Sequence, residues 1–286
     1  MILPGPSHEL ICPQPIVDTL LYGSSSYISL EELGTPVYTN WDTGRLVITS
    51  IGIPEDNLFP DGLTTIKWIV ADTTCGLLDS CEQNVNIVFP ECPDAVDCEG
   101  NNYSSVRIDN YCWTKINLRS GHYQEADGSC GDTIPCIYEY TSLLHPNTAE
   151  NVDTFGRLYC FQAAVGDSTV NENGHIQGIC PAGWYLPTPE QYLQLNSHGA
   201  YALKVPYYWT DGGGDNSTGF TWLPAGYWNG AAQRFEGMLS DSYFWSAKVV
   251  NGEIHYSAIW LHHDCDSVQE VEAHEGMGFS IRCIKE

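Results

Sequence analysis

The chain has 286 residues, of which 43% are hydrophobic and only 16% are charged, and this composition supplies enough apolar material for one or two packed domains. Its 36 acidic residues outnumber its 11 basic residues and give a net charge of −25. Such a charge repels phosphate backbones, so we exclude nucleic acid as a partner. The sequence contains no run of about 18 apolar residues, so we expect no membrane span.

The twelve cysteines predict a disulfide framework. None of their spacings is the paired CxxC pattern of a structural zinc site. Because disulfides persist in oxidising compartments, we expect the protein to be extracellular, on a bacterial cell surface or on a phage particle. Two pairs that lie close in sequence, Cys92–Cys98 and Cys130–Cys136, are expected to form bridges.

Residues 1–90 have the pattern of short strands separated by turns. Runs of β-branched and alternating apolar residues recur at a spacing of roughly ten residues, and clusters of Gly, Pro, Asp and Ser separate them. The runs are 26–30, 46–51, 64–70 and 83–88. This pattern predicts an N-terminal β-sandwich.

Four segments of this stretch resemble the HYR module, an immunoglobulin-like domain of extracellular proteins. They are ICP at 11–13, FPDGLTTI at 59–66, VAD at 70–72 and SCEQNVNI at 80–87. The resemblance implies an immunoglobulin-like fold and a Cys12–Cys81 bridge. Modules of this kind are usually spacers or docking units, and we find no catalytic motif in this stretch.

The composition changes near residue 91. Residues 91–101 are rich in Pro, Asp and Gly, and we interpret them as a hinge. Residues 102–286 contain frequent Trp, long Gly-rich loops and few helix signals, which predicts a β-rich α+β domain with large irregular segments. The clearest helix signal is the capping-box pattern from Thr188 to Gln191, with Pro189 at the first helical position.

Six segments of this C-terminal part resemble, in order, the Fibrobacter succinogenes major paralogous domain. They are VRIDNYCW at 106–113, FGRLY at 155–159, CPAGWYLPT at 180–188, GFTWLPAG at 219–226, YFWSA at 243–247 and GFSIRC at 278–283. The resemblance implies a C-type-lectin-like fold. We expect the large residues of these segments to be the buried framework, namely Trp113, Trp184, Phe244, Trp245, Phe279 and Cys283.

Between Phe220 and Gly278 the sequence is rich in side chains that combine a large contact area with a polar group, as binding surfaces do. Trp222 stands where the family resemblance leads us to expect a small residue. We predict that one exposed face binds a ligand, and that ordinary core packing is the alternative. The predicted binding residues are Trp222, Tyr227, Trp228, Gln233, His255, Tyr256, Trp260, His262 and His263.

An oxygen-rich loop, DGGGDNS at 211–217, could hold calcium. Asp211, Asp215 and Asn216 are the candidate ligands, although the loop lacks the ligand spacing of an EF-hand. A turn-rich loop without metal is the alternative. No other cofactor is expected.

The adjacent residues His262, His263 and Asp264 could bind a transition metal. Neighbouring residues of a strand point to opposite faces, so we favour an exposed loop without metal at this place.

No motif of a serine hydrolase, zinc protease or P-loop enzyme occurs, so we predict a binding protein rather than an enzyme. The predicted function is that of an adhesin or phage receptor-binding protein, whose ligand is a protein or glycan on another cell or surface. Lectin-like domains that end in a strand of this kind are targets of diversity-generating retroelements, so the binding segment could be hypervariable. The alternatives are a formylglycine-generating-type or other enzyme on the same fold and a purely structural surface module.

Overall fold

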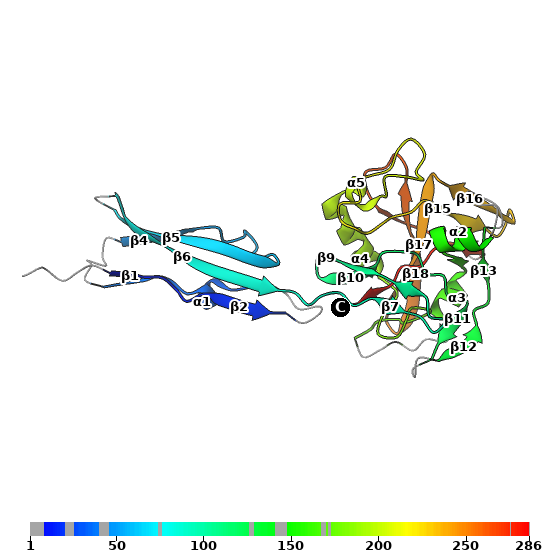
Figure 1. Cartoon of the computed structure of the whole chain (residues 1–286), viewed down its shortest axis with the longest axis horizontal. Helices are drawn as coiled ribbons and strands as arrows, with labels where there is room; N and C mark the ends of the chain where they lie inside the picture. The colour runs from blue at the N-terminus through cyan, green and yellow to red at the C-terminus, as the bar shows by residue number, and fades with distance from the viewer. Residues whose placement is uncertain are drawn as a thin grey trace, which may run out of the picture. The chain divides into compact units, whose positions relative to one another are not determined.

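The computed structural model of the chain describes residues 9–20, 26–39, 46–73, 76–125, 129–140, 148–166, 170, 173–274 and 276–285. The chain divides into two compact units, Met1–Glu91 and Cys92–Glu286, and each has its own apolar core. Both units are rich in strands and contain few, short helices, as the sequence predicts (Figure 1). No helix among the described residues is long and apolar enough to cross a bilayer.

The first unit consists of a four-stranded sheet, which contributes the strand residues of the apolar core, and a two-stranded sheet. Strand β5 illustrates the pattern, because Ile66, Trp68 and Val70 are buried while the residues between them are more exposed, as expected for a strand with one covered face. The strand orders are β2-β6-β5-β4 and β1-β3. The elements are β1 (Glu9–Ile11), β2 (Ile16–Thr19), α1 (Leu30–Leu33), β3 (Val37–Thr39), β4 (Leu46–Ile51), β5 (Gly62–Asp72) and β6 (Gly76–Val88).

The Cys12–Cys81 bridge implied by the sequence resemblance is present and joins Cα atoms 5.8 Å apart. Three of the four predicted runs lie within strands β4, β5 and β6. The run 26–30 is not a strand, because the Ser29 hydroxyl and the Glu32 carboxylate form a capping box that starts helix α1. This local hydrogen bonding overrides the apolar pattern.

The second unit contains several small sheets and one six-stranded sheet of order β16-β15-β17-β18-β19, with β20 paired to β15. The predicted capping box of Thr188 and Gln191 is present and starts helix α4. The strands are β7 (Ala95–Val96), β8 (Asn102–Tyr103), β9 (Ser105–Ile108), β10 (Tyr111–Thr114), β11 (His122–Gln124), β12 (Cys130–Thr133), β13 (Ile137–Tyr138), β14 (Leu158–Tyr159), β15 (Ala225–Asn229), β16 (Arg234–Met238), β17 (Asp241–Val250), β18 (Glu253–His262), β19 (Gln269–Val271), β20 (Met277–Gly278) and β21 (Ile284–Lys285). The helices are α2 (Thr148–Phe155), α3 (Phe161–Val165), α4 (Pro189–Gln194), the 3-10 helix η2 (Leu195–His198) and α5 (Ala200–Leu203).

Two predicted bridges, Cys92–Cys98 and Cys130–Cys136, are wrong. The structure instead joins Cys92 to Cys112 and Cys98 to Cys130. The reason is the turn between strands β7 and β8, in which the Asp97 carboxylate accepts hydrogen bonds from the backbone N–H groups of Glu99 and Asn101. These local bonds hold the turn without a bridge of its own, and each nearby cysteine pairs with a distant strand.

The same two bridges tie the segment that we interpreted as a hinge, from Cys92 onward, to the second unit. Strand β7 pairs with β8, and residues from Cys92 onward belong to the second unit. Both covalent links start in this segment and end in strands β10 and β12. The Pro- and Asp-rich composition therefore marks an ordered entry strand and turn.

The predicted framework is buried. Trp113, Trp184, Phe244, Trp245, Phe279 and Cys283 all have 3% or less of their surface exposed. A fourth bridge, Cys180–Cys283, joins two of the family-like segments across 103 residues of sequence. The bridge and the burial of these residues thus bring segments that are far apart in sequence together in the interior of the second unit.

Arg282 holds the loop before strand β15 against strand β10. It is fully buried, and its guanidinium donates to the carbonyls of Thr114 (2.6 Å), Phe220 (2.8 Å) and Thr221 (2.7 Å) and to the side-chain oxygen of Asn117 (2.7 Å). Burial lowers the pKa of Arg282 to about 9, which still leaves the group charged at neutral pH. The four bonds offset the loss of hydration.

We expect Arg282→Lys to destabilise the second unit by about 2–3 kcal/mol, because an ammonium group cannot match the planar fork and leaves buried acceptors unpaired. Urea unfolding followed by tryptophan fluorescence measures the loss. Arg234→Lys is the matched control, since the Arg234 side chain is 71% exposed and its replacement should change stability by less than about 0.5 kcal/mol. Equal midpoints for the two variants would contradict this role of Arg282.

Candidate functional site

The two long strands β17 and β18 present different side chains on their two faces. They pair antiparallel, with Asp241 opposite His262 and Tyr243 opposite Trp260. Side chains alternate along a strand, so these four residues lie on one face. On the other face Phe244 and its neighbours belong to the main core. Figure 1 shows the two strands side by side in the second unit.

An open cavity of about 340 Å³ lies on the first face. We call it the aromatic hollow, and its lining residues are Tyr227, Tyr243, Trp260, Val271, Glu272, His274, Met277 and Phe279. The Tyr243 ring is central, with its centroid 4.9 Å from Tyr227, 5.2 Å from Phe279 and 6.4 Å from Trp260. These contacts fix four aromatic rings in a single continuous surface.

Carboxylates hold the polar groups of two of these rings. The Trp260 Nε1–H donates to Asp241 Oδ1 at 2.7 Å, and the Tyr227 hydroxyl donates to Glu236 Oε2 at 2.6 Å. Hydrogen bonds from Tyr227, Asn229 and Arg234 lower the pKa of Glu236 to about 2, while burial, followed by the bond to Glu236, raises the pKa of Tyr227 to about 12. The donor and acceptor therefore keep these protonation states across the physiological range, and Arg234, 2.6 Å from Glu236 Oε1, offsets the charge of this carboxylate.

Two of the nine predicted binding residues line the aromatic hollow, and two more lie beside it. Tyr227 and Trp260 line the aromatic hollow. The His262 ring lies 5.7 Å from Trp260, and the His263 ring lies 4.2 Å from His262. These residues are therefore close to one another, and their role in binding stays a prediction.

The prediction that Trp222 belongs to the exposed binding surface is wrong. Its side chain is fully buried and packs with Phe220 (5.0 Å) and Phe244 (5.0 Å). The large residue found where a small one was expected fills the core and does not reach the surface. A tryptophan in sequence does not reveal which of these roles it has, because its area serves both.

Trp228 is half-buried and also has a packing role. Its ring stacks on Tyr138 at 4.7 Å and contacts Phe235 at 5.0 Å. Gly278 permits this contact, because a Cβ atom there would come within 2.6 Å of the Tyr138 ring and 3.0 Å of the Trp228 Cβ. Trp228 therefore faces away from the aromatic hollow's lining.

The remaining three predicted residues lie elsewhere. His255 and Tyr256 are exposed near the start of strand β18, about 20 Å along the strand from His262 at the usual rise of about 3.3 Å per residue. Tyr256 stacks on Phe161 at 3.9 Å. Gln233 is exposed in the turn between β15 and β16, where its side chain donates to the Gly230 carbonyl. The nine residues consequently do not form one surface.

Several residues of the hollow were missed by the sequence interpretation. Tyr243 is not among the predicted binding residues, yet it is only partly buried and lies at the centre of the hollow. The signal was available, since alternation along two paired strands puts Tyr243 beside Trp260. Glu272, His274 and Met277 come from loops and a short strand, and no periodic pattern identifies such residues.

The predicted calcium ligands do not converge. The Asp215 carboxylate accepts the Ser217 N–H at 2.9 Å, and the Asn216 side chain bonds to Thr221, so both shape the turn. Asp211 instead lies 4.0 Å from His263. The expectation that His262 and His263 point apart is wrong as well, because strand β18 ends at His262 and the chain turns there.

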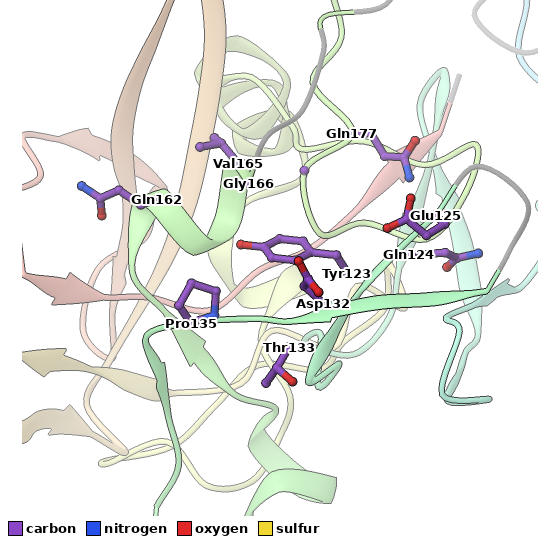
Figure 2. Close-up of a pocket in the computed structure, with 11 residues that line it drawn as sticks. Tyr123, Gln124, Glu125, Asp132, Thr133, Pro135, Gln162, Val165, Gly166 and Gln177 are labelled. Carbon is purple, nitrogen blue, oxygen red and sulfur yellow. The ribbon is translucent and has the colours of Figure 1, made fainter.

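A second, wider cavity of about 800 Å³ lies between the β11–β12 hairpin and helix α3. Figure 2 shows Tyr123 near its centre, with Gln162, Val165 and Pro135 on one side and Gln177, Gln124 and Glu125 on the other. Most of its lining side chains are amides or carboxylates. Exchanging water for ligand at such groups yields only about 0.5–1.5 kcal/mol per hydrogen bond, so this cavity favours binding less than the aromatic hollow does.

Three described cysteines have no bridge, namely Cys136, Cys160 and Cys265. Burial and a hydrogen bond with Cys136 raise the pKa of Cys160 to about 11. A thiol with this pKa is almost fully protonated at neutral pH and is a poor nucleophile. The geometry therefore gives no support to covalent catalysis at Cys160.

Residues 106–285 match a known family, the Fibrobacter succinogenes major domain. The match covers more than half of the chain and lies entirely in the second unit. No curated protein and no solved structure matches the chain.

Proposed function

The chain belongs to the Fibrobacter succinogenes major domain family, and we propose that it is an extracellular binding protein that takes its ligand into the aromatic hollow. We further propose that the second unit has a C-type-lectin-like fold and that the first unit is an immunoglobulin-like sandwich acting as a spacer. Four disulfides support an oxidising compartment. The proposed location is a bacterial surface, as an adhesin, or a phage particle.

The observation that carries this proposal is the partly exposed aromatic surface of Tyr227, Tyr243 and Trp260. Rigid aromatic side chains give much contact area for little lost entropy, and they dominate the energetics of binding interfaces. In this hollow the rings are already fixed by one another and by Asp241 and Glu236. A ligand therefore does not have to order them on binding.

Charge favours a protein ligand that presents a basic side chain. The carboxylates of Asp241 and Glu272 bond to the lining of the hollow or belong to it, and the whole chain carries a charge of −25. Glu236 also bonds to Tyr227 but is already paired with Arg234. A lysine or arginine side chain would lie against the ring faces by cation–π attraction and near these carboxylates. A neutral glycan is the competing ligand, whereas acidic glycans would be repelled.

We expect Trp260→Ala to weaken binding by about 2 kcal/mol, roughly 30-fold, because the ring is a central contact of the hollow. The measurement is binding of the full chain to an array that carries both neutral oligosaccharides and basic peptides, followed by affinity determination for each hit. Binding to a basic peptide should weaken as salt rises, whereas binding to a neutral sugar should not.

His255→Ala is the matched control, since His255 is exposed on the same strand but far from the hollow, and it should bind as the wild type does. Hits that bind wild type and Trp260→Ala equally would refute the hollow as the site. An array without any hit would count against a binding role and would favour the structural module or the enzyme as the function.

Hypervariability of the binding segment by a retroelement is a further proposal. The structure limits it to positions such as Tyr227 and Trp260, because a buried residue such as Trp222 cannot vary without loss of packing. The neighbouring DNA tests this directly. An imperfect repeat of the coding segment that differs only at adenines, next to a reverse transcriptase gene, is the expected finding.

A further inference from the structure

Three metal-ligating side chains gather at the end of strand β18. His262 is the last residue of the strand, and a turn follows in which the Cys265 N–H donates to the His262 carbonyl at 3.2 Å. Ligating atoms of His262, His263 and Asp264 lie within 4.8 Å of one another. Within the described ranges of the chain this is the single such group of histidine, cysteine and acidic side chains.

A fourth ligating side chain comes from a different loop. The Asp211 carboxylate lies 4.0 Å from His263 Nδ1. Both loops are fastened to the turn between β16 and β17, because the Thr210 N–H donates to the Leu239 carbonyl and the His263 N–H donates to the Ser240 carbonyl, each at 2.7 Å. The proximity of Asp211 to His263 is thus fixed by the backbone.

A buried lysine fixes the backbone of the turn itself. Lys204 is only 4% exposed, and its ammonium group donates to the carbonyls of His262 (2.8 Å), His263 (2.9 Å) and Cys265 (3.0 Å). It also lies 5.0 Å from the Trp209 ring centroid. The turn is therefore ordered without an ion, and this preorganisation lowers the cost of binding one.

The four side chains remain open to solvent above this fixed backbone. The exposed fractions are 26% for His262, 19% for His263, 69% for Asp264 and 82% for Asp211. Ligand atoms on one tetrahedral zinc ion are about 3.3–3.6 Å apart, given metal–ligand distances of about 2.0–2.2 Å. The present separations are at most 4.8 Å among His262, His263 and Asp264 and 4.0 Å between Asp211 and His263, so they exceed the zinc value by about 1.5 Å or less.

From this geometry we infer that the chain binds one transition-metal dication of the zinc class through His262, His263, Asp264 and Asp211. Two imidazoles with carboxylates suit zinc, nickel and copper better than calcium or magnesium, which take oxygen ligands. The net charge of −25 attracts cations in general, and the imidazoles give the preference for transition metals. The site is separate from the aromatic hollow, although the His262 ring lies only 5.7 Å from Trp260.

The test is calorimetric titration of Zn²⁺ into the full chain, purified without a histidine tag and stripped with a chelator. We expect one ion per chain, bound with a dissociation constant on the order of micromolar. His263→Ala should weaken zinc binding at least about 10-fold, as loss of a ligand does. Asp211→Asn should also weaken zinc binding. This variant preserves the fold, because asparagine tolerates the positive φ of 59° at this position.

His255→Ala is the matched control, because it removes an exposed histidine from the far end of the same strand, and it should bind zinc as the wild type does. Trp260→Ala should also keep its zinc affinity, which separates this site from the aromatic hollow. Failure of the wild type to bind zinc at about 100 times the expected dissociation constant overturns the inference. So does zinc binding that survives both His263→Ala and Asp211→Asn.

Discussion

A fragment that begins at Cys92 is expected to fold as the whole second unit does, whereas one that begins at residue 99 is expected to be largely unfolded. The shorter fragment lacks Cys92 and Cys98 and so leaves Cys112 and Cys130 without partners. Each bridge contributes about 2–4 kcal/mol, so the two together approach the total stability of about 5–15 kcal/mol of a typical domain. The Pro-rich composition of 91–101 would place the boundary wrongly.

Near-UV circular dichroism and thermal melting of fragments 92–286 and 99–286 measure this difference. A control fragment 92–286 that carries Cys92→Ser and Cys98→Ser has the full length but neither bridge. Its melting temperature should be close to that of fragment 99–286. The loss of stability would then come from the missing bridges and not from strand β7, which fragment 99–286 also lacks. If fragments 92–286 and 99–286 melted at the same temperature, this account would be contradicted.

Local patterns predicted the framework of both units. Alternating apolar residues in 64–70 and 83–88 identified two paired strands, and the capping box at Thr188 identified the start of helix α4. The buried tryptophans were expected from the family resemblance of their segments, although Tyr243, in one of these segments, is only partly buried. The strand and helix predictions depend on neighbouring residues only, and the sequence contains that information.

Pairings across the chain could not be predicted in the same way. Cys92 lies six residues from Cys98 but pairs with Cys112, because a tight turn held by Asp97 directs the two cysteines to different strands. Likewise Asp211 and His263 meet only because both of their loops bond to one turn. Sequence spacing gives no measure of such distances.

The candidate site was predicted in part for the same reason. Tyr227 and Trp260 were chosen for their composition, and they line one hollow because strand β15 pairs with strand β17, with Gly226 beside Ser242. That pairing also brings Tyr243 between them. Trp222, chosen by the same criterion, is buried. Composition identifies the kind of side chain a binding site uses, and only tertiary structure decides which ones are exposed.

Trp245→Ala is expected to destabilise the second unit by about 3–5 kcal/mol, the usual cost of truncating a buried tryptophan. Trp245 is 1% exposed, its ring lies 4.4 Å from Phe279 and 5.4 Å from Phe161, and its Nε1–H donates to the Tyr159 carbonyl at 2.6 Å. It therefore packs strand β17 against helix α3 and the last family-like segment. A cavity there would loosen the aromatic layer that also supports the hollow through Phe279.

Urea unfolding of the full chain, followed by near-UV circular dichroism, measures this loss. Trp260→Ala is the comparison on the neighbouring strand, and it should cost about 1 kcal/mol or less, because its ring is partly exposed. Trp228→Ala should fall between the two, since it loses the stack on Tyr138. If Trp260→Ala destabilised the protein as much as Trp245→Ala, the rings of the hollow would be core residues, and the proposed binding site would lose its basis.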